Sequence, residues 1–280
     1  MLTQTKFHYS RKIIRIFLSE QEREEWFAAF EKHKGVFAAT EPWKDSLNGQ
    51  LKLPFGAGQI TTAGNVYTPA FLEAVRSLLT ARNAFLREKV SYEKIEVMHD
   101  EVRYDQKVSA SKIIFCEGHL ALNNPFIATP FVKPMKGEVL HLNIPDLKTE
   151  HVLSSGCYLM PAGEGKFICG SNYEGRRIDE QPTEEIRREL TEKVSNMINC
   201  DFEITAHVAG IRPTVYDHRP VVGVTENSRV AVFNGLGSKG ILQAPLLSGL
   251  LSEELENGRP VPEEISPLRF ARRAARKKQQ

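Results

Sequence analysis

The chain has 280 residues, of which 41% are hydrophobic and 26% are charged, and its formal net charge is +2. This length allows one large domain or two interleaved ones around a sizeable core, and the small net charge excludes a strong overall field that would attract nucleic acid or a membrane surface. No segment reaches the about 18 consecutive apolar residues that cross a bilayer. The apolar stretch Ile16–Leu18 is too short for a signal peptide, so we expect a cytoplasmic protein.

The four cysteines favour a reducing compartment. Cys116, Cys157, Cys169 and Cys200 form no C-x-x-C pair, and several lie in apolar runs. We therefore expect buried free thiols. The histidines show no metal-ligand spacing, so the sequence predicts no metal site.

The first half of the chain alternates predicted strands and helices. A strand over 11–18 leads to a helix with Ser19 as N-cap and Glu22 completing a capping box. A loop rich in Gly and Pro follows and ends in LPFGAGQITTAGNVYTP (53–69), where Thr68-Pro69 starts a second helix. Strand-like pieces come next, around 84–90, 94–98 and 101–108, and then the apolar run KIIFC (112–116), typical of a buried parallel strand.

The second half predicts more strands, of the antiparallel kind. The expected elements are strands at 137–144, 157–161 and 166–171 with a hairpin turn at 162–165, an exposed helix from 183 to about 199, a strand at 203–213, the loop VYDHRPVVG (215–223), a strand at 229–234 and a final helix from 240. This order predicts a mixed α/β (α+β) fold.

The segment Gly235-Leu236-Gly237-Ser238-Lys239-Gly240 has G-x-G-x-x-G spacing between a predicted strand and a predicted helix. A dinucleotide-binding turn is one hypothesis. However, only one helix and a basic, proline-dotted stretch follow, with no strand that ends in an acid. Two further hypotheses stay open: structural glycines, or a helix N-terminus whose unpaired N–H groups stabilise anionic charge on a bound ring such as flavin.

Four segments in order carry a family resemblance. They are PMKGEVLHL (134–142), YLMPAGEGKFICGSNYEG (158–175), AGIRPTVYDHRPVVG (209–223) and NGLGSKGILQAPLLSGLLSEEL (234–255). Together they resemble the FAD-dependent oxidoreductases of the D-amino-acid oxidase and glycine oxidase type. The last two, with SPLRFARR, are also similar to the FAD domain of the bifunctional tRNA wobble-uridine enzyme MnmC. The resemblance runs from about residue 50 to 270.

The resemblance also implies how the chain is divided. Family members open with a strand, a G-x-G-x-x-G turn and a helix, which are not found here, so the resemblance implies a truncated chain with an incomplete FAD-binding Rossmann-like domain interleaved with an antiparallel-sheet substrate domain. The expected segments are 1–60 (substrate domain), 61–130 (FAD-binding domain), 131–213 (substrate domain), 214–260 (C-terminal part of the FAD-binding domain) and 261–280 (a basic tail).

By resemblance, Arg212 in the GIRP motif binds the substrate carboxylate, and its planar guanidinium suits two parallel bonds. Pairing with Asp217 or Asp201 is the structural alternative. Tyr158 is expected to close over the substrate, although a core tyrosine explains it as well.

The cofactor-binding residues that the resemblance implies fall in three stretches. The flavin edge is expected at Gly237, Ser238, Lys239, Gly240 and Ile241. The turn Cys116-Glu117-Gly118 is expected to pass the FAD pyrophosphate with the Glu117 side chain pointing away, and the backbone of Val90 to hold the adenine.

The implied chemistry is hydride transfer from the carbon next to an amine onto flavin, which gives an imine that water hydrolyses. The substrate would be an amino acid or secondary amine. Two alternatives remain: a tRNA wobble-uridine modifying FAD oxidase, and a non-catalytic remnant that no longer binds FAD. The basic C-terminus bears on the first, as either a solvated tail or an arm that contacts RNA phosphates; its cations are Arg269, Arg272, Arg273, Arg276, Lys277 and Lys278.

Overall fold

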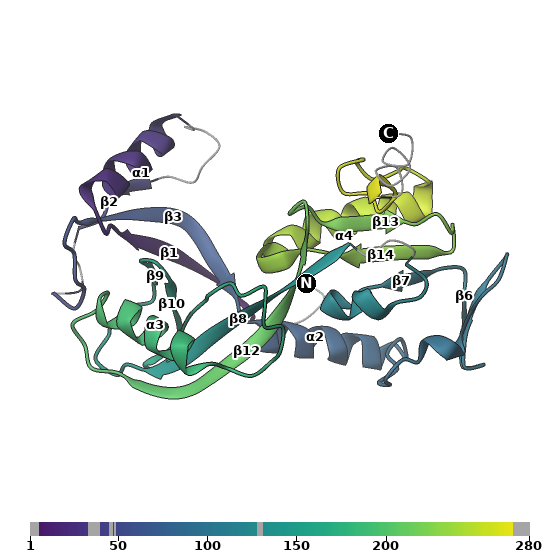
Figure 1. Ribbon diagram of the computed structural model, residues 1–280, viewed down its shortest axis with the longest axis horizontal. Coiled ribbons are helices and arrows are strands. Elements are labelled where there is room, and N and C mark those ends of the chain that lie inside the picture. Colours follow the sequence, from purple (N-terminus) through teal and green to yellow (C-terminus); the bar gives the residue numbers. More distant parts are fainter. Residues whose placement is uncertain (1–5, 33–39, 45–46, 48, 128–130, 271–280) are drawn as a thin grey trace. The chain divides into compact units, whose positions relative to one another are not determined.

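The computed structural model describes residues 6–32, 40–44, 47, 49–127 and 131–270 (Figure 1). The chain divides into two units. Unit 1 contains the described parts of Met1–Leu86, Gly137–Tyr173 and Asp179–Gly210, and unit 2 those of Arg87–Lys136, Glu174–Ile178 and Ile211–Gln280. The predicted mixed α/β class is confirmed, and the units alternate along the chain. Their boundaries differ from the predicted ones, because unit 1 continues to Leu86 and residues 131–136 belong to unit 2.

One large sheet dominates unit 1, and two of its strands continue into unit 2. Its strand order is β12-β8-β11-β10-β9-β1-β3-β2. The β1–β9 pair is parallel, and the pairs β8–β11, β11–β10, β10–β9, β1–β3 and β3–β2 are antiparallel. The strands are β1 (His8–Ile16), β2 (Thr40–Pro42), β3 (Ala57–Val66), β8 (Val132–Asn143), β9 (Val152–Ser154), β10 (Tyr158–Gly163), β11 (Lys166–Gly170) and β12 (Glu203–Val215).

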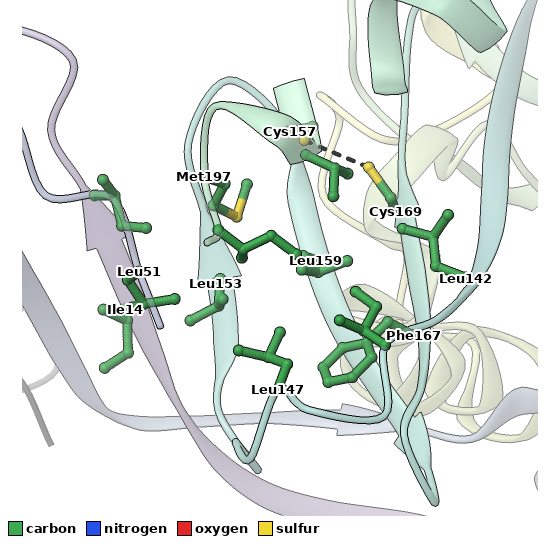
Figure 2. Packing of buried hydrophobic residues seen from close by; sticks show 14 of the residues in the cluster. Ile14, Leu51, Leu142, Leu147, Leu153, Cys157, Leu159, Phe167, Cys169 and Met197 are labelled. Carbon is green, nitrogen blue, oxygen red and sulfur yellow. Dashed lines mark hydrogen bonds between the residues drawn. The ribbon is translucent and has the colours of Figure 1, made fainter. Parts of the chain in front are cut away.

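The core of unit 1 lies between this sheet and helix α3 (Glu184–Ser195). Figure 2 shows Leu153, Leu159 and Met197 meeting in this core. The helix predicted at 183–199 was expected to be exposed, but Leu190 and Val194 are completely buried. Most residues of this helix are charged or polar, so its short apolar face was not recognised from the sequence.

The Gly- and Pro-rich stretch at 53–69 is not a loop as predicted, because ten of its residues form β3. Two of the glycines that suggested a loop are instead needed for close packing in a strand. A Cβ on Gly58 would overlap the ring of Trp26, and one on Gly64 would lie 2.7 Å from the Tyr9 carbonyl oxygen. Glycine in a strand marks such close approaches as well as turns.

Helix α1 (Glu20–Lys32) begins at the predicted cap. The Glu22 amide donates to Ser19 Oγ at 3.1 Å, while the Glu22 carboxylate accepts from the Leu18 amide at 2.8 Å rather than from Ser19. We expect Ser19→Ala to lower the free energy of unfolding by about 1 kcal/mol, because a helix amide loses its acceptor. Chemical denaturation measures this. Ser19→Asn, which keeps a capping oxygen, is the control, and an equal loss in both variants would contradict the capping role.

Unit 2 contains a three-stranded sheet in the order β13-β14-β7 and a separate antiparallel sheet, β4-β5-β6, whose strands precede β7 in the chain. Its elements are β4 (Ile95–Val97), β5 (Val102–Tyr104), β6 (Val108–Ala110), β7 (Ile113–Phe115), β13 (Val221–Val224), β14 (Val230–Asn234) and α4 (Gly240–Asn257), with short 3-10 turns η1 (Tyr92–Lys94), η2 (Gly118–Asn123) and η3 (Gly237–Lys239); the remaining helix, α2 (Thr68–Ala81), belongs to unit 1. The predicted strand at 84–90 is irregular, and the end of the predicted loop 215–223 forms β13.

The described part of the predicted basic tail, residues 261–270, belongs to unit 2. Arg269 is buried, and its guanidinium donates to both carboxylate oxygens of Asp217 at 3.0 and 3.1 Å. The planar guanidinium also lies over the Phe270 ring. Arg269 is therefore not the solvated tail residue that was expected, and the other predicted tail cations lie outside the described residues.

In the part of the chain that the structure describes, no helix is both long enough and apolar enough to cross a membrane.

Candidate functional site

Two turns of unit 2 meet at one edge of its parallel strand pair. β7 and β14 run parallel, with Ile113 opposite Val230 and Phe115 opposite Val232. The turn Cys116–Gly118 follows β7, and the Gly-rich turn 235–240 follows β14. Ligands of open α/β sheets bind outside the carboxyl ends of parallel strands. The two stretches that the resemblance implied for different parts of FAD are thus neighbours.

A buried asparagine ties the two turns together. Asn234 is 2% exposed; its Nδ2 donates to the Gly118 carbonyl oxygen at 2.9 Å and its Oδ1 accepts from the Gly235 amide at 2.7 Å. Both ends of the side-chain amide are used, so the spacing of the turns is fixed by one residue. Asn234 was not among the predicted site residues, and its bridging role is visible only from its burial and its two hydrogen bonds.

The two glycines at the start of the turn have different surroundings. Gly235 and Gly237 both adopt left-handed backbone angles, with φ of 75° and 56°. A Cβ on Gly235 would lie 2.5 Å from Val215 Cγ2 and 3.2 Å from the Val221 amide nitrogen, whereas one on Gly237 would meet only Thr214 Cγ2, at 3.5 Å. Gly235 is therefore required by packing, while Gly237 leaves open space beside the backbone.

The start of α4, which follows η3 directly, combines the partial positive charge of a helix N-terminus with exposed apolar side chains. The first amides of a helix have no acceptor inside it and carry partial positive charge. Ile241, Leu242 and Leu246 near this end are 49%, 80% and 70% exposed. A flat aromatic ring with hydrogen-bond acceptors along one edge fits this combination, so these residues suit an isoalloxazine. A dinucleotide-binding βαβ unit would require a strand after α4, but residues 258–270 contain none.

The carboxylate of Glu117, in the turn after β7, accepts two hydrogen bonds from side chains of unit 2. Glu117 accepts from Tyr92 Oη at 2.5 Å and from Asn124 Nδ2 at 2.6 Å. Burial and this hydrogen bond raise the pKa of Tyr92 to about 12. The Glu117 carboxylate therefore has partners inside unit 2, which agrees with a backbone rather than a side-chain role beside phosphates. Cys116 is exposed rather than buried as expected, and it follows Phe115, the one buried residue of β7.

The remaining predicted residues lie apart in the chain. Val90 is 56% exposed and belongs to no strand. Arg212 lies on β12 within unit 2, where its Nη1 donates to the Lys136 carbonyl oxygen at 3.3 Å. Tyr158 lies on β10 in unit 1, whereas Arg212 and the predicted cofactor residues belong to unit 2. No group of three or more His, Cys, Asp or Glu among the residues described is placed to hold a metal ion.

Comparisons with known proteins give consistent results. The family model described as FAD dependent oxidoreductase matches residues 3–254. The tRNA 5-methylaminomethyl-2-thiouridine biosynthesis bifunctional protein MnmC of Marinobacter nauticus is 30% identical over 167 residues, which are 54% of this chain and 26% of the relative. Glycine oxidase of Pseudomonas aeruginosa is 28% identical over 149 residues, covering 50% of this chain and 39% of the relative. The chain thus spans less than half the length of these relatives.

A solved structure shares the fold. The crystal structure of glycine oxidase from Geobacillus kaustophilus superposes with a TM-score of 0.78 at 20% identity, over 91% of this chain and 72% of that one. At this identity the likeness concerns the fold, and it covers both units of the chain.

Proposed function

Because the chain belongs to the FAD dependent oxidoreductase family, we propose that it supplies the flavin-edge and substrate residues of an enzyme that oxidises a C–N bond of an amino acid or secondary amine. The observation that carries the proposal is the pair of turns at the carboxyl ends of β7 and β14, joined by Asn234. A fixed pair of turns beside the open start of a helix is suited to hold one extended cofactor. The glycine oxidase relatives support an amino-acid substrate.

In this proposal the Gly-rich turn holds the flavin ring edge. Backbone amides between Gly237 and Ile241 donate to the ring, where partial positive charge at the helix start stabilises the reduced form. The Lys239 amide is excepted, because it donates to the Leu236 carbonyl oxygen at 3.1 Å. Lys239 is exposed in the same turn and adds a full positive charge. The backbone of Cys116–Gly118 passes the pyrophosphate, and the backbone of Val90 holds the adenine.

The substrate is oriented by its carboxylate. FAD, when bound, supplies the acceptor for the hydride that leaves the carbon next to the amine. Arg212 binds the carboxylate through two parallel N–H bonds, and the Lys136 carbonyl fixes one end of its guanidinium. Tyr158, on β10 of unit 1, stays a predicted substrate residue. The protein in this scheme positions the reacting carbon, so it needs no strong acid or base.

The experiment that tests the function is steady-state kinetics of the FAD-loaded protein with a panel of amines. We expect Arg212→Ala to lower kcat/KM for carboxylate-bearing amines roughly 30- to 1,000-fold, because a charge-assisted bidentate contact contributes about 2–4 kcal/mol. Amines without a carboxylate should be affected little. Arg188→Ala, at an exposed arginine of α3, is the matched control. Equal losses for both classes of amine would rule out carboxylate binding by Arg212.

A further inference from the structure

Two cysteine thiols meet in the core of unit 1 (Figure 2). Cys157 lies in the turn before β10 and Cys169 on β11, twelve residues further along the chain. Their Sγ atoms are 3.5 Å apart, with Cys169 donating to Cys157. Cys157 is 8% exposed and Cys169 is fully buried. The pair is separate from the turns of the candidate cofactor site, all of which belong to unit 2.

The two sulfurs differ in acidity. The hydrogen bond from Cys169 lowers the pKa of Cys157 against the effect of burial. The Lys193 ammonium also lowers it, while Glu189, which pairs with Lys193 at 2.5 Å, raises it. The same hydrogen bond, together with burial, raises the pKa of Cys169. This difference favours Cys157 as the sulfur of the pair that ionises first.

The backbone around Cys157 permits the sulfurs to approach. A disulfide requires an S–S distance of about 2.05 Å, so the sulfurs must approach by about 1.5 Å. Cys169 is fixed within the sheet, where it pairs with Leu159 of β10 and Leu140 of β8. Cys157 instead follows Gly156, which has a left-handed φ of 67° and only side-chain carbons of Lys193 near the position of a Cβ. Because Cys157 lies outside the strands, an adjustment of this turn at Gly156, together with the Ser155 amide that donates to the Cys157 carbonyl oxygen at 2.8 Å, would bring the sulfurs together.

We propose that Cys157 and Cys169 are a redox modification site that hydrogen peroxide oxidises to an intramolecular disulfide. The Cys157 thiolate attacks one peroxide oxygen, the O–O bond breaks, and a sulfenic acid and hydroxide result. The Cys169 sulfur then attacks Cys157 Sγ and displaces the sulfenic oxygen, while the thiol proton leaves with it as water. In total, two thiols and one peroxide give one disulfide and two waters, so peroxide is reduced as the sulfurs are oxidised.

The test is peptide mapping of the full chain after treatment with hydrogen peroxide, with free thiols alkylated before digestion. We expect one disulfide that joins the Cys157 and Cys169 peptides and is reversed by dithiothreitol. Cys116 is exposed at the surface, but partial desolvation of its thiol and the nearby Glu117 carboxylate raise its pKa, so it should react at least about tenfold more slowly because its thiolate fraction is small. Peroxide oxidation of Cys116 with both Cys157 and Cys169 still free would overturn the proposal.

Single variants separate the two roles. In Cys169→Ser, Cys157 should be trapped as a sulfenic acid that dimedone labels; in Cys157→Ser, Cys169 should stay unlabelled. Lys193→Gln should slow disulfide formation severalfold in a chain whose cysteines are all present. Lys166→Gln, at an exposed lysine of β11, is its control. If either serine variant unfolds, the comparison of Lys193→Gln with Lys166→Gln still tests the assigned roles. Equal rates in the two lysine variants, or dimedone labelling of Cys169 in Cys157→Ser, would contradict the assigned roles.

Discussion

Replacing Gly235 with valine should lower the free energy of unfolding by about 4 kcal/mol, as two costs add up. A β-branched side chain at φ of 75° costs about 1–3 kcal/mol in backbone strain. The new Cβ also lies 2.5 Å from Val215 Cγ2 and 3.2 Å from the Val221 amide, and overpacking of this kind typically costs a further 1–3 kcal/mol. Urea denaturation followed by circular dichroism measures the loss.

Gly237→Val is the matched control, because it adds the same side chain at a similar φ. Its Cβ meets only Thr214 Cγ2, at 3.5 Å, so only the strain remains and the loss of stability should be clearly smaller. This variant should instead weaken flavin binding while binding of ADP alone is unchanged, because the side chain fills the open space beside the turn. A larger loss of stability at Gly237 than at Gly235 would contradict this division of roles. Equal losses of FAD and ADP affinity in Gly237→Val would revive the dinucleotide-binding hypothesis.

Periodicity and capping predicted most elements of this fold. The cap at Ser19 and the start of α2 at Thr68 follow from local chemistry, and the apolar run at 112–116 contains the parallel strand β7. The expected burial of that strand is wrong for part of it, because only Phe115 is buried and Ile114 is 41% exposed. The failure at 53–69 has a different origin. The glycines there are explained by the ring of Trp26 and the backbone of Tyr9, which approach from residues more than thirty and fifty positions away. No local pattern encodes such contacts.

The candidate site was predictable to a similar extent. The Gly-rich turn and the turn after 112–116 were found from sequence because both end apolar strands. Their proximity, however, depends on the pairing of β14 with β7, which brings residues more than a hundred positions apart together. Asn234 could not be singled out because an asparagine before a glycine is common at turns. Only its burial and its two hydrogen bonds distinguish it.

Replacing Asn234 with aspartate should destabilise the protein in a pH-dependent way. The new carboxylate keeps the bond from the Gly235 amide but faces the Gly118 carbonyl oxygen without a proton to donate. At neutral pH an uncompensated buried charge costs about 3–5 kcal/mol, so this is a large loss for a single isosteric change. When the carboxyl is protonated, its O–H replaces the lost N–H donor and stability should approach that of the original protein.

The sign of the pH dependence follows from the raised pKa of the new carboxyl, since burial and the carbonyl oxygen both favour its protonated form in the folded state. The folded state then binds more protons than the unfolded one, so stability falls as pH rises. The fall begins near the pKa of an unfolded aspartate, about 4, and ends above the raised pKa of the folded state. Denaturation at several pH values measures it, with Asn227→Asp at an exposed turn as the control. A variant whose stability loss is the same at acidic and neutral pH would show that the Asn234 side chain does not bridge the two turns.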